Sequence, residues 1–251
     1  MLAEIHFLHI RSERADAIPL LLTHGWPSSV FEYIKIIPLL SDSFHLVIPS
    51  LPGHGFSSIR PGTSIYKTAE LFHKLMTQEL GYERYAAQGG DWGAYVSSRL
   101  GFLYPDCLFG IHLSYVVGGI SPFLGMGTRA LSATENTMVD KRKRWDSEEG
   151  GYEHVHSTKP QTIAFSHWLT GTGGSSVRLY YETRHDPWMF TENDKIRART
   201  AIASFPKELV VSPREWAERI YNVQRWTDMP LQDQREPSAL LKDSRHVEMS
   251  T

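Results

Sequence analysis

The segment from Gln88 to Gly93, with the sequence QGGDWG, holds the clearest candidate for a reacting side chain. A short β-prone run, Arg84–Ala87, precedes it, and a helical pattern begins at Ala94. The glycines on either side allow a strand and a helix to approach each other around a sharp turn with unusual backbone angles. Asp91 would lie at the tip of this turn, where a carboxylate can attack an electrophilic carbon and form an ester.

A strand, a G-x-nucleophile-x-G turn and a helix, in this order, form the nucleophile elbow of α/β-hydrolases. With aspartate at the central position, acyl transfer of the serine type is not available, which narrows the chemistry. Aspartate beside glycine is also common as a helix N-cap. The local pattern of Asp91 leaves both interpretations open, because short glycine-rich motifs occur by chance.

A second loop could supply hydrogen-bond donors to the same site. The continuous apolar run Ala17–Thr23 is typical of a buried strand, and it leads directly into the loop His24–Pro27. The backbone N–H groups of Trp26, in this loop, and of Trp92, after the predicted nucleophile, would form an oxyanion hole. A plain strand-end turn is the alternative for either loop, but two such loops in the correct order favour a site.

Composition and charge exclude several classes of function. The chain has 251 residues, of which 41% are hydrophobic and 22% charged, as expected for one soluble α/β domain with an insertion. A net charge of -2 argues against nucleic acid and anionic membranes as partners. The chain has no membrane-spanning run, no signal-peptide pattern and a single cysteine, Cys107, so we expect a cytoplasmic protein. Without a metal-ligand cluster or a dinucleotide fingerprint, no metal and no cofactor are expected.

The remaining pattern alternates strands with helices. Further strands are expected at Glu4–Ile10, Phe44–Pro49, Cys107–Val116, Ala201–Phe205 and Val223–Trp226. Helices are expected at Val30–Leu40, Ser64–Leu80, Pro213–Ile220 and Pro237–Arg245. This order predicts an α/β fold with a doubly wound, mostly parallel sheet. Residues 1–117 would form the first part of the core, residues 118–200 a shortened helical lid inserted after the nucleophile half, and residues 201–251 the last part of the core.

Taken together, the motifs resemble the microsomal-type epoxide hydrolases of the α/β-hydrolase superfamily. The similarity runs in order along nearly the whole chain, through His24–Pro27, Leu51–Ser57, Gly89–Gly93, Gly151–Tyr152, Ser157–Thr162, Arg178–Glu182, Phe205–Glu208, Ala217–Val223 and Arg225–Pro230. It favours the nucleophile interpretation of Asp91 over the helix cap. It implies an α/β-hydrolase fold and an enzyme that converts a small lipophilic epoxide and water to a vicinal diol.

The resemblance also implies a role for each matching residue. Asp91 would be the nucleophile, and Tyr152 and Tyr180, on the lid, would donate protons to the epoxide oxygen. Phenols suit this role because they are neutral donors at pH 7, with an ordinary pKa of about 10. Without the resemblance, ordinary lid packing would be favoured for either tyrosine. Glu208 would orient a histidine that activates water, and no metal takes part.

The sequence departs from the family at three places, and the first of them concerns the second half of that reaction. Members continue after the step at Met229-Pro230 into a Gly-Gly-His-Phe loop, whereas residues 231–237 contain no histidine. His246 is expected to be a solvated residue at a helix end. The segment before Glu4 and the lid near Phe165 are also shorter than in the family. These departures predict a truncated or altered gene product in which ester formation survives and ester hydrolysis is impaired.

Two other functions remain open. Haloalkane dehalogenases also have an aspartate nucleophile followed by tryptophan, but they usually have asparagine where Trp26 stands and lack the paired lid tyrosines. A ligand-binding homologue without catalysis agrees with the missing histidine, but not with the presence of Asp91, Tyr152, Tyr180 and Glu208. The sequence does not specify the epoxide, a detoxifying or biosynthetic role, or the oligomeric state.

Overall fold

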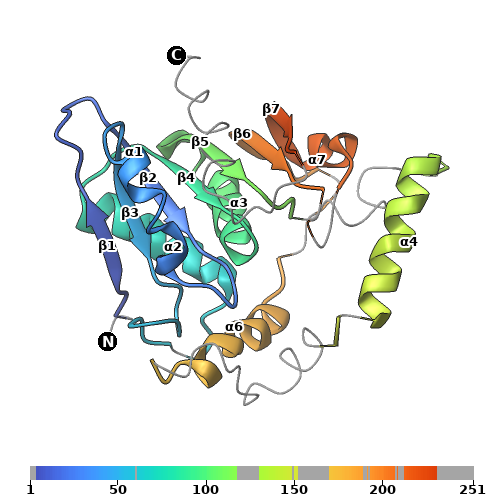
Figure 1. Cartoon of the computed structure of the whole chain (residues 1–251), viewed down its shortest axis with the longest axis horizontal. Coiled ribbons are helices and arrows are strands. Elements are labelled where there is room, and N and C mark those ends of the chain that lie inside the picture. Colours follow the sequence, from blue (N-terminus) through green and yellow to red (C-terminus); the bar gives the residue numbers. More distant parts are fainter. Residues whose placement is uncertain are drawn as a thin grey trace.

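The computed structural model describes residues 4–59, 61–117, 130–148, 150–151, 170–188, 191, 193–206, 208 and 212–230. Tyr152, His246 and the helix predicted at 237–245 lie outside these residues. The described strands form one seven-stranded sheet in the order β1-β3-β2-β4-β5-β6-β7 (Figure 1). They are β1 (Phe7–Ile10), β2 (Ile18–Thr23), β3 (Phe44–Pro49), β4 (Tyr85–Gly89), β5 (Leu108–Leu113), β6 (Ile196–Ser204) and β7 (Tyr221–Asp228).

The β1–β3 pair is antiparallel, and the other neighbouring strands are parallel. The helices that connect and cover them are α1 (Ile37–Leu40), α2 (Ile65–Lys74), α3 (Trp92–Leu103), α4 (Ala133–Glu148), α6 (Gly173–His185) and α7 (Arg214–Ile220). Two 3₁₀ helices, η1 (Val30–Tyr33) and η3 (Pro105–Cys107), and the π-helical turn η2 (Leu75–Glu79) complete the described elements. The predicted doubly wound, mostly parallel sheet is confirmed.

Each face of the sheet has its own apolar core, because successive side chains of a strand point to opposite faces. In β2, Leu21 belongs to the larger cluster, which α2 and α3 cover. Its neighbours Leu20 and Leu22 belong to a second cluster on the other face, with residues of η1 and α1. A strand that is buried on both faces reads as a continuous apolar run, which is why β2 could be predicted from the sequence.

The single helix predicted at Val30–Leu40 is instead two short elements, η1 and α1. Pro38 explains the break, because proline has no N–H to donate and its ring clashes with the carbonyl one turn earlier. In the structure Pro38 lies in the first turn of α1, the place in a helix where proline is tolerated.

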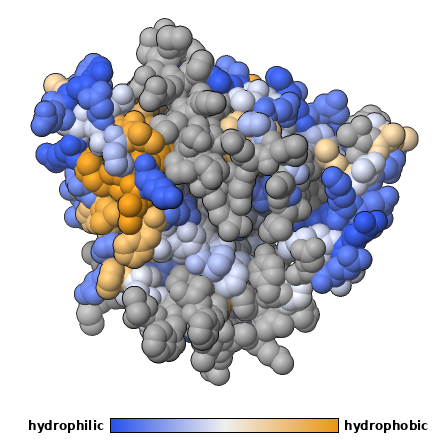
Figure 2. Space-filling view, viewed as in Figure 1, coloured by the Kyte–Doolittle hydropathy of each residue, from blue (hydrophilic) through white to orange (hydrophobic). Residues whose placement is uncertain are grey.

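This segment is apolar on both sides. It contributes Val30, Tyr33 and Ile36 to the smaller core, while the exposed fractions of Phe31 and Ile34 are 64% and 52%. Figure 2 shows a hydrophobic patch over this part of the molecule, at the left of the view. Exposed apolar residues stand here beside the exposed polar residues Glu32 and Lys35, so the helical period is blurred and the sequence pattern could not define the ends of the segment.

Two described helices belong to the region between β5 and β6, where the sequence predicted a lid. Strand β6 begins at Ile196, so the last residues of the predicted lid range, 196–200, belong to the sheet. Helix α4 lies beside α7 at the β7 end of the sheet (Figure 1). Buried Glu135 connects the two helices, because it accepts a hydrogen bond from Trp216 Nε1 at 2.6 Å and another from the N–H of Ser132 at 2.7 Å. No helix of the described residues is long and apolar enough to cross a membrane.

Replacing Tyr221 by phenylalanine tests how β7 is attached to the segment that leads into the lid. The buried hydroxyl of Tyr221 lies 2.8 Å from Ser98 Oγ, donates to the carbonyl of Val117 at 3.1 Å and accepts from its N–H at 3.2 Å. Phenylalanine leaves these buried groups without that partner, so we expect a loss of about 2 kcal/mol in the free energy of unfolding. Urea unfolding checks this value, and a variant as stable as the wild type would contradict it.

Candidate active site

Asp91 occupies the turn between β4 and α3, with φ +47° and ψ -127°. Among the described residues it is the one non-glycine residue with a positive φ. Such a backbone costs on the order of 1–3 kcal/mol and persists only where the surroundings enforce it. The predicted strand, sharp turn and helix around Asp91 are therefore present, with the aspartate at the strained position.

Two glycines make this turn possible. A β-carbon at Gly93 would overlap with the backbone oxygen of Thr23 at the end of β2, and one at Gly89 would overlap with the backbone of Gly93. A third glycine, Gly25, faces the aspartate itself, since a β-carbon there would lie 2.5 Å from Asp91 Oδ1. Helix α3 thus starts in direct contact with the loop after β2.

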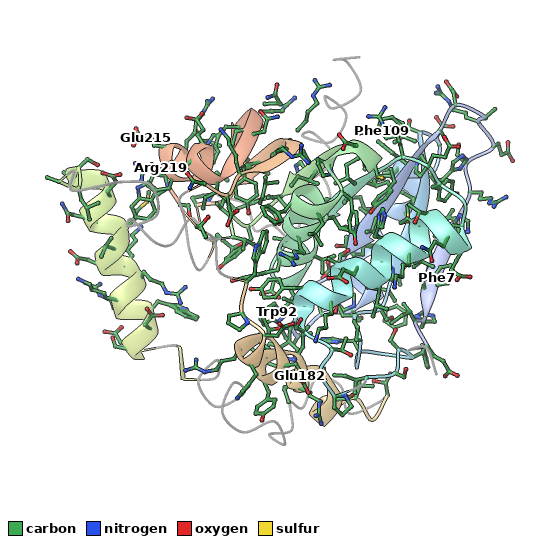
Figure 3. The ribbon with its side chains drawn as sticks, turned by 180° about the vertical axis from the view of Figure 1, so that it is seen from behind. Phe7, Trp92, Phe109, Glu182, Glu215 and Arg219 are labelled. Atoms are coloured by element: carbon green, nitrogen blue, oxygen red, sulfur yellow. The ribbon has the colours of Figure 1, made fainter. Side chains whose placement is uncertain are left out.

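The backbone N–H of Trp26 donates a hydrogen bond to Asp91 Oδ1 at 2.8 Å. Trp26 follows β2, and Asp91 follows the neighbouring parallel strand β4, so both lie at the carboxyl edge of the sheet. This edge is where open α/β sheets place their ligands. Trp92, which was predicted to supply the second donor, is the first residue of α3 and lies next to α6 in Figure 3.

Tyr180, on α6, is buried beside both tryptophans. Its ring lies edge-on to the rings of Trp92 and Trp26, with centroid distances of 4.8 Å and 5.6 Å. The next residue, Tyr181, packs its ring on His185 at 4.1 Å and is only partly buried. The structure therefore brings Tyr180, and not Tyr181, to the turn that carries Asp91.

Helix α6 is fixed to the core by hydrogen bonds between residues far apart in the sequence. Thr183 Oγ1 accepts from the N–H of Ile65 at 3.1 Å, at the start of α2. Glu182 Oε2 accepts from the N–H of Gly62 at 2.9 Å, and Ser175 Oγ donates to the carbonyl of Gly53 at 2.7 Å. Side chains on both sides of Tyr180 along α6 thus anchor the helix, which limits how far its phenol can move.

Glu208 lies just beyond the end of β6 and is half-buried. It lines a small cavity at the carboxyl ends of β5, β6 and β7. The space that the centre of a water molecule can occupy in this cavity is about 10 Å³. Polar lining comes from Glu208, Ser114, Tyr115, Ser204 and Ser212, and Trp226 forms one wall. The predicted acid is thus at the same edge of the sheet as Asp91.

The sequence analysis missed Tyr95 and Tyr115. Their rings stack with centroids 6.0 Å apart, and Tyr95 also packs on Trp92 at 5.1 Å. Burial, the nearby Tyr95 and the negative charge of Asp91 raise the pKa of Tyr115 well above its usual value, and Arg142 of α4 acts in the opposite direction. Its phenol is therefore neutral at any physiological pH. The position of Tyr115, two residues after β5, was a usable signal, because it places the side chain at the ligand-binding edge.

The histidines in the turn motifs, His24 and His54, contact backbone N–H and carbonyl groups of the neighbouring loops. His24 Nε2 accepts from the N–H of Leu51 at 3.0 Å, and its Nδ1 lies 2.9 Å from the carbonyl of Gly25. His54 Nδ1 lies 3.1 Å from the carbonyl of Pro52. Both ring nitrogens of His24 are thus engaged, so this histidine has a structural role. No group of three or more potential metal ligands occurs in the described part of the chain.

Family models match two parts of the sequence. Residues 18–123 match the model described as alpha/beta hydrolase fold, and residues 2–33 match the model described as epoxide hydrolase N terminus. Epoxide hydrolase 1 of Oryctolagus cuniculus is 30% identical over an alignment that covers 87% of this chain and 65% of that protein. Juvenile hormone epoxide hydrolase of Bombyx mori is 36% identical, over 63% of this chain and 39% of that protein.

Solved structures extend this similarity to the fold. The epoxide hydrolase of Aspergillus niger superposes with a TM-score of 0.80 and 28% identity, covering 97% of this chain and 74% of that one. The juvenile hormone epoxide hydrolase of the silkworm has a TM-score of 0.83 at 24% identity. The chain spans 60–65% of the length of the first curated relatives that it matches.

Proposed function

The chain belongs to an epoxide hydrolase family of the α/β-hydrolase superfamily, and from this premise we propose that it opens a lipophilic epoxide through an ester on Asp91. One observation carries the proposal: a carboxylate on a strained turn, with a backbone N–H on one oxygen and a buried phenol beside it. Epoxide carbons are electrophiles that a carboxylate can attack directly.

In the first step, the N–H of Trp26 keeps its hydrogen bond to Oδ1 of Asp91, and the other oxygen of Asp91 attacks a carbon of the epoxide. The carbon–oxygen bond of the ring breaks, and the oxygen takes a proton from a lid phenol. Tyr180 supplies one phenol, because its ring packs against both tryptophans of the predicted oxyanion hole. Tyr152, outside the described residues, would supply the second.

In the second step, water attacks the ester carbon of Asp91, and the N–H groups of Trp26 and Trp92 stabilise the oxyanion that forms. Donors that are already oriented lower this barrier, typically by about 3–4 kcal/mol for one donor. Collapse of this intermediate releases the vicinal diol and leaves Asp91 protonated. This proton returns to the lid phenolate that formed in the first step, which restores the carboxylate and the phenol. Glu208 belongs to this half of the reaction, in the transfer of a proton from the attacking water. A cytoplasmic location and a lipophilic substrate remain predictions from the sequence.

Intact-mass spectrometry of the purified protein with styrene oxide, alongside diol measurement, tests this function. A covalent adduct, diol release, or both would support it. If neither an adduct nor diol forms, the proposal is refuted in favour of a ligand-binding protein. A primary haloalkane, tested in parallel, distinguishes dehalogenase chemistry, because the same nucleophile would then release halide.

We expect replacement of Tyr180 by phenylalanine to slow ring opening about 10²-fold, the usual cost of removing one donor to a developing oxyanion. Hydrolysis of an ester that has already formed should keep its rate, since the lid phenol acts on the epoxide oxygen. Stopped reactions analysed by mass spectrometry separate the two steps. Tyr181→Phe is the matched control, because its ring contacts His185 instead. Equal rates in the two variants would contradict the role of Tyr180.

A further inference from the structure

The small cavity beside Glu208 bears on how this chain hydrolyses the ester. Its volume of about 10 Å³ is close to the lower limit for one water molecule. A buried water needs two to four polar partners, and the lining supplies Glu208, Tyr115, Ser114 and Ser212. The cavity therefore has both the size and the chemistry to bind one water.

Tyr115 connects this cavity with the elbow. Tyr115 is one of the lining residues, and its ring stacks on Tyr95, which packs on Trp92. The charge of Asp91 also acts on the Tyr115 phenol. Ser114, the preceding residue, donates its N–H to the carbonyl of Gly89 at 3.3 Å, two residues before Asp91. The cavity wall is thus continuous with the turn that holds the predicted nucleophile.

The sheet order gives the approximate span between the ends of the two strands that lead to these carboxylates. Asp91 follows β4 and Glu208 follows β6, with β5 between them. Neighbouring strands lie about 4.8 Å apart, so the two strand ends are separated by about 10 Å. A relay across this gap requires a bridge, which the attacking water and one water in the cavity would form.

We propose that Glu208 itself accepts the proton of the hydrolytic water, through a water held in the cavity that Glu208 shares with Tyr115. This inference rests on the proposed ester at Asp91. The sequence has no histidine between His185 and His246, so the loop at residues 231–237, where the resemblance places the family's base, contains no imidazole. Glu208 and one water then take the place of the family's relay, in which an acid orients a histidine base.

The attacking water forms a bond from its oxygen to the ester carbon and passes one proton to the cavity water, which passes one of its own protons to Glu208. The carbon–oxygen bond to the diol then breaks, and the departing alkoxide takes back a proton from the protonated Glu208 through the same water. Asp91 is left as a carboxylic acid, and it returns its proton to the lid phenolate that ring opening formed. The Tyr115 oxygen accepts a hydrogen bond from the cavity water, which fixes its orientation, so Tyr115 is a positioning residue.

The test measures ring opening and ester decay separately, by rapid quench and intact-mass spectrometry with styrene oxide. In Glu208→Gln we expect ester decay to slow at least about 10²-fold, the usual contribution of a general base, while ring opening keeps its rate. In Tyr115→Phe, which preserves the ring packing, ester decay should slow about tenfold, the equivalent of one hydrogen bond. His246→Ala should behave as the wild type.

The pH profile of ester decay adds a measurement that a purely structural role would not change. A base must be deprotonated, so the rate falls as the pH drops through the pKa of the base. A carboxyl group has an ordinary pKa of about 4.3 and a histidine one of about 6.5. We expect the rate of ester decay in the wild type to fall as the pH drops through one titration. This titration should be absent from the pH profile of Glu208→Gln.

Several results would overturn the proposal. They are a stable ester in the wild type, undiminished ester decay in Glu208→Gln, a titration that survives in that variant, loss of decay in His246→Ala, and slower ring opening instead of slower decay in Tyr115→Phe. In each of these cases the wild type still forms the ester at Asp91, so the proposed function stands. A wild type that forms no ester and no diol would instead remove the proposed function itself, so the two failures can be told apart.

Discussion

Replacing Asp91 by asparagine is expected to abolish covalent ester formation with an epoxide. The amide nitrogen that replaces one carboxylate oxygen is a poor nucleophile, so the first chemical step loses its attacking group. Removal of a catalytic nucleophile typically costs on the order of 10⁴-fold or more in rate. Intact-mass spectrometry after incubation with styrene oxide should show the unmodified protein, and diol should not exceed the uncatalysed background.

Asparagine is the appropriate substitution because it removes the nucleophile and preserves the turn and its hydrogen bond. Asparagine has nearly the same shape as the aspartate that already adopts this turn at φ +47°, so the turn can persist. Its side-chain oxygen can still accept the hydrogen bond from the N–H of Trp26. The variant should therefore unfold at nearly the wild-type temperature. Asp91→Ala is a second variant without any side-chain nucleophile, and an adduct in either variant would place the reacting group elsewhere.

The elbow was predictable because its determinants are local. Glycines at 89 and 93, an apolar run before them and a helical pattern after them lie within a few residues, and together they specify the turn that carries Asp91. The loop at Trp26 was predictable for the same reason, since it follows the continuous apolar strand β2. Short-range sequence patterns thus define both sides of the candidate site.

The rest of the site depends on contacts that no local pattern encodes. The bond between Thr183 and Ile65, which anchors α6, joins residues 118 positions apart. Tyr115 reaches the Glu208 cavity only because β5 lies between β4 and β6 in the sheet. A tyrosine after a strand is ordinary in sequence, and its neighbours are set by strand order. The choice between Tyr180 and Tyr181 needed either the family resemblance or the orientation of α6.

Replacing Gly93 by alanine is expected to have the largest effect on stability. The added β-carbon would overlap with the backbone oxygen of Thr23, a fully buried residue at the end of β2. Neither group can move alone, because Thr23 is paired with Gly89 in the sheet and Gly93 belongs to the first turn of α3. Overpacking of this kind costs about 3 kcal/mol or more.

For a chain of this size, such a cost lowers the melting temperature by about 6–12 °C. Thermal unfolding followed by circular dichroism measures the change. Gly174→Ala, in the first turn of α6, is the matched control, because no atom lies within 4 Å of a β-carbon there. Alanine in a helix is favoured over glycine by about 0.5–1 kcal/mol, so the control should be as stable as the wild type or more stable. If Gly93→Ala behaved like the control, close contact between α3 and the loop after β2 would not be what holds Asp91 in its strained turn.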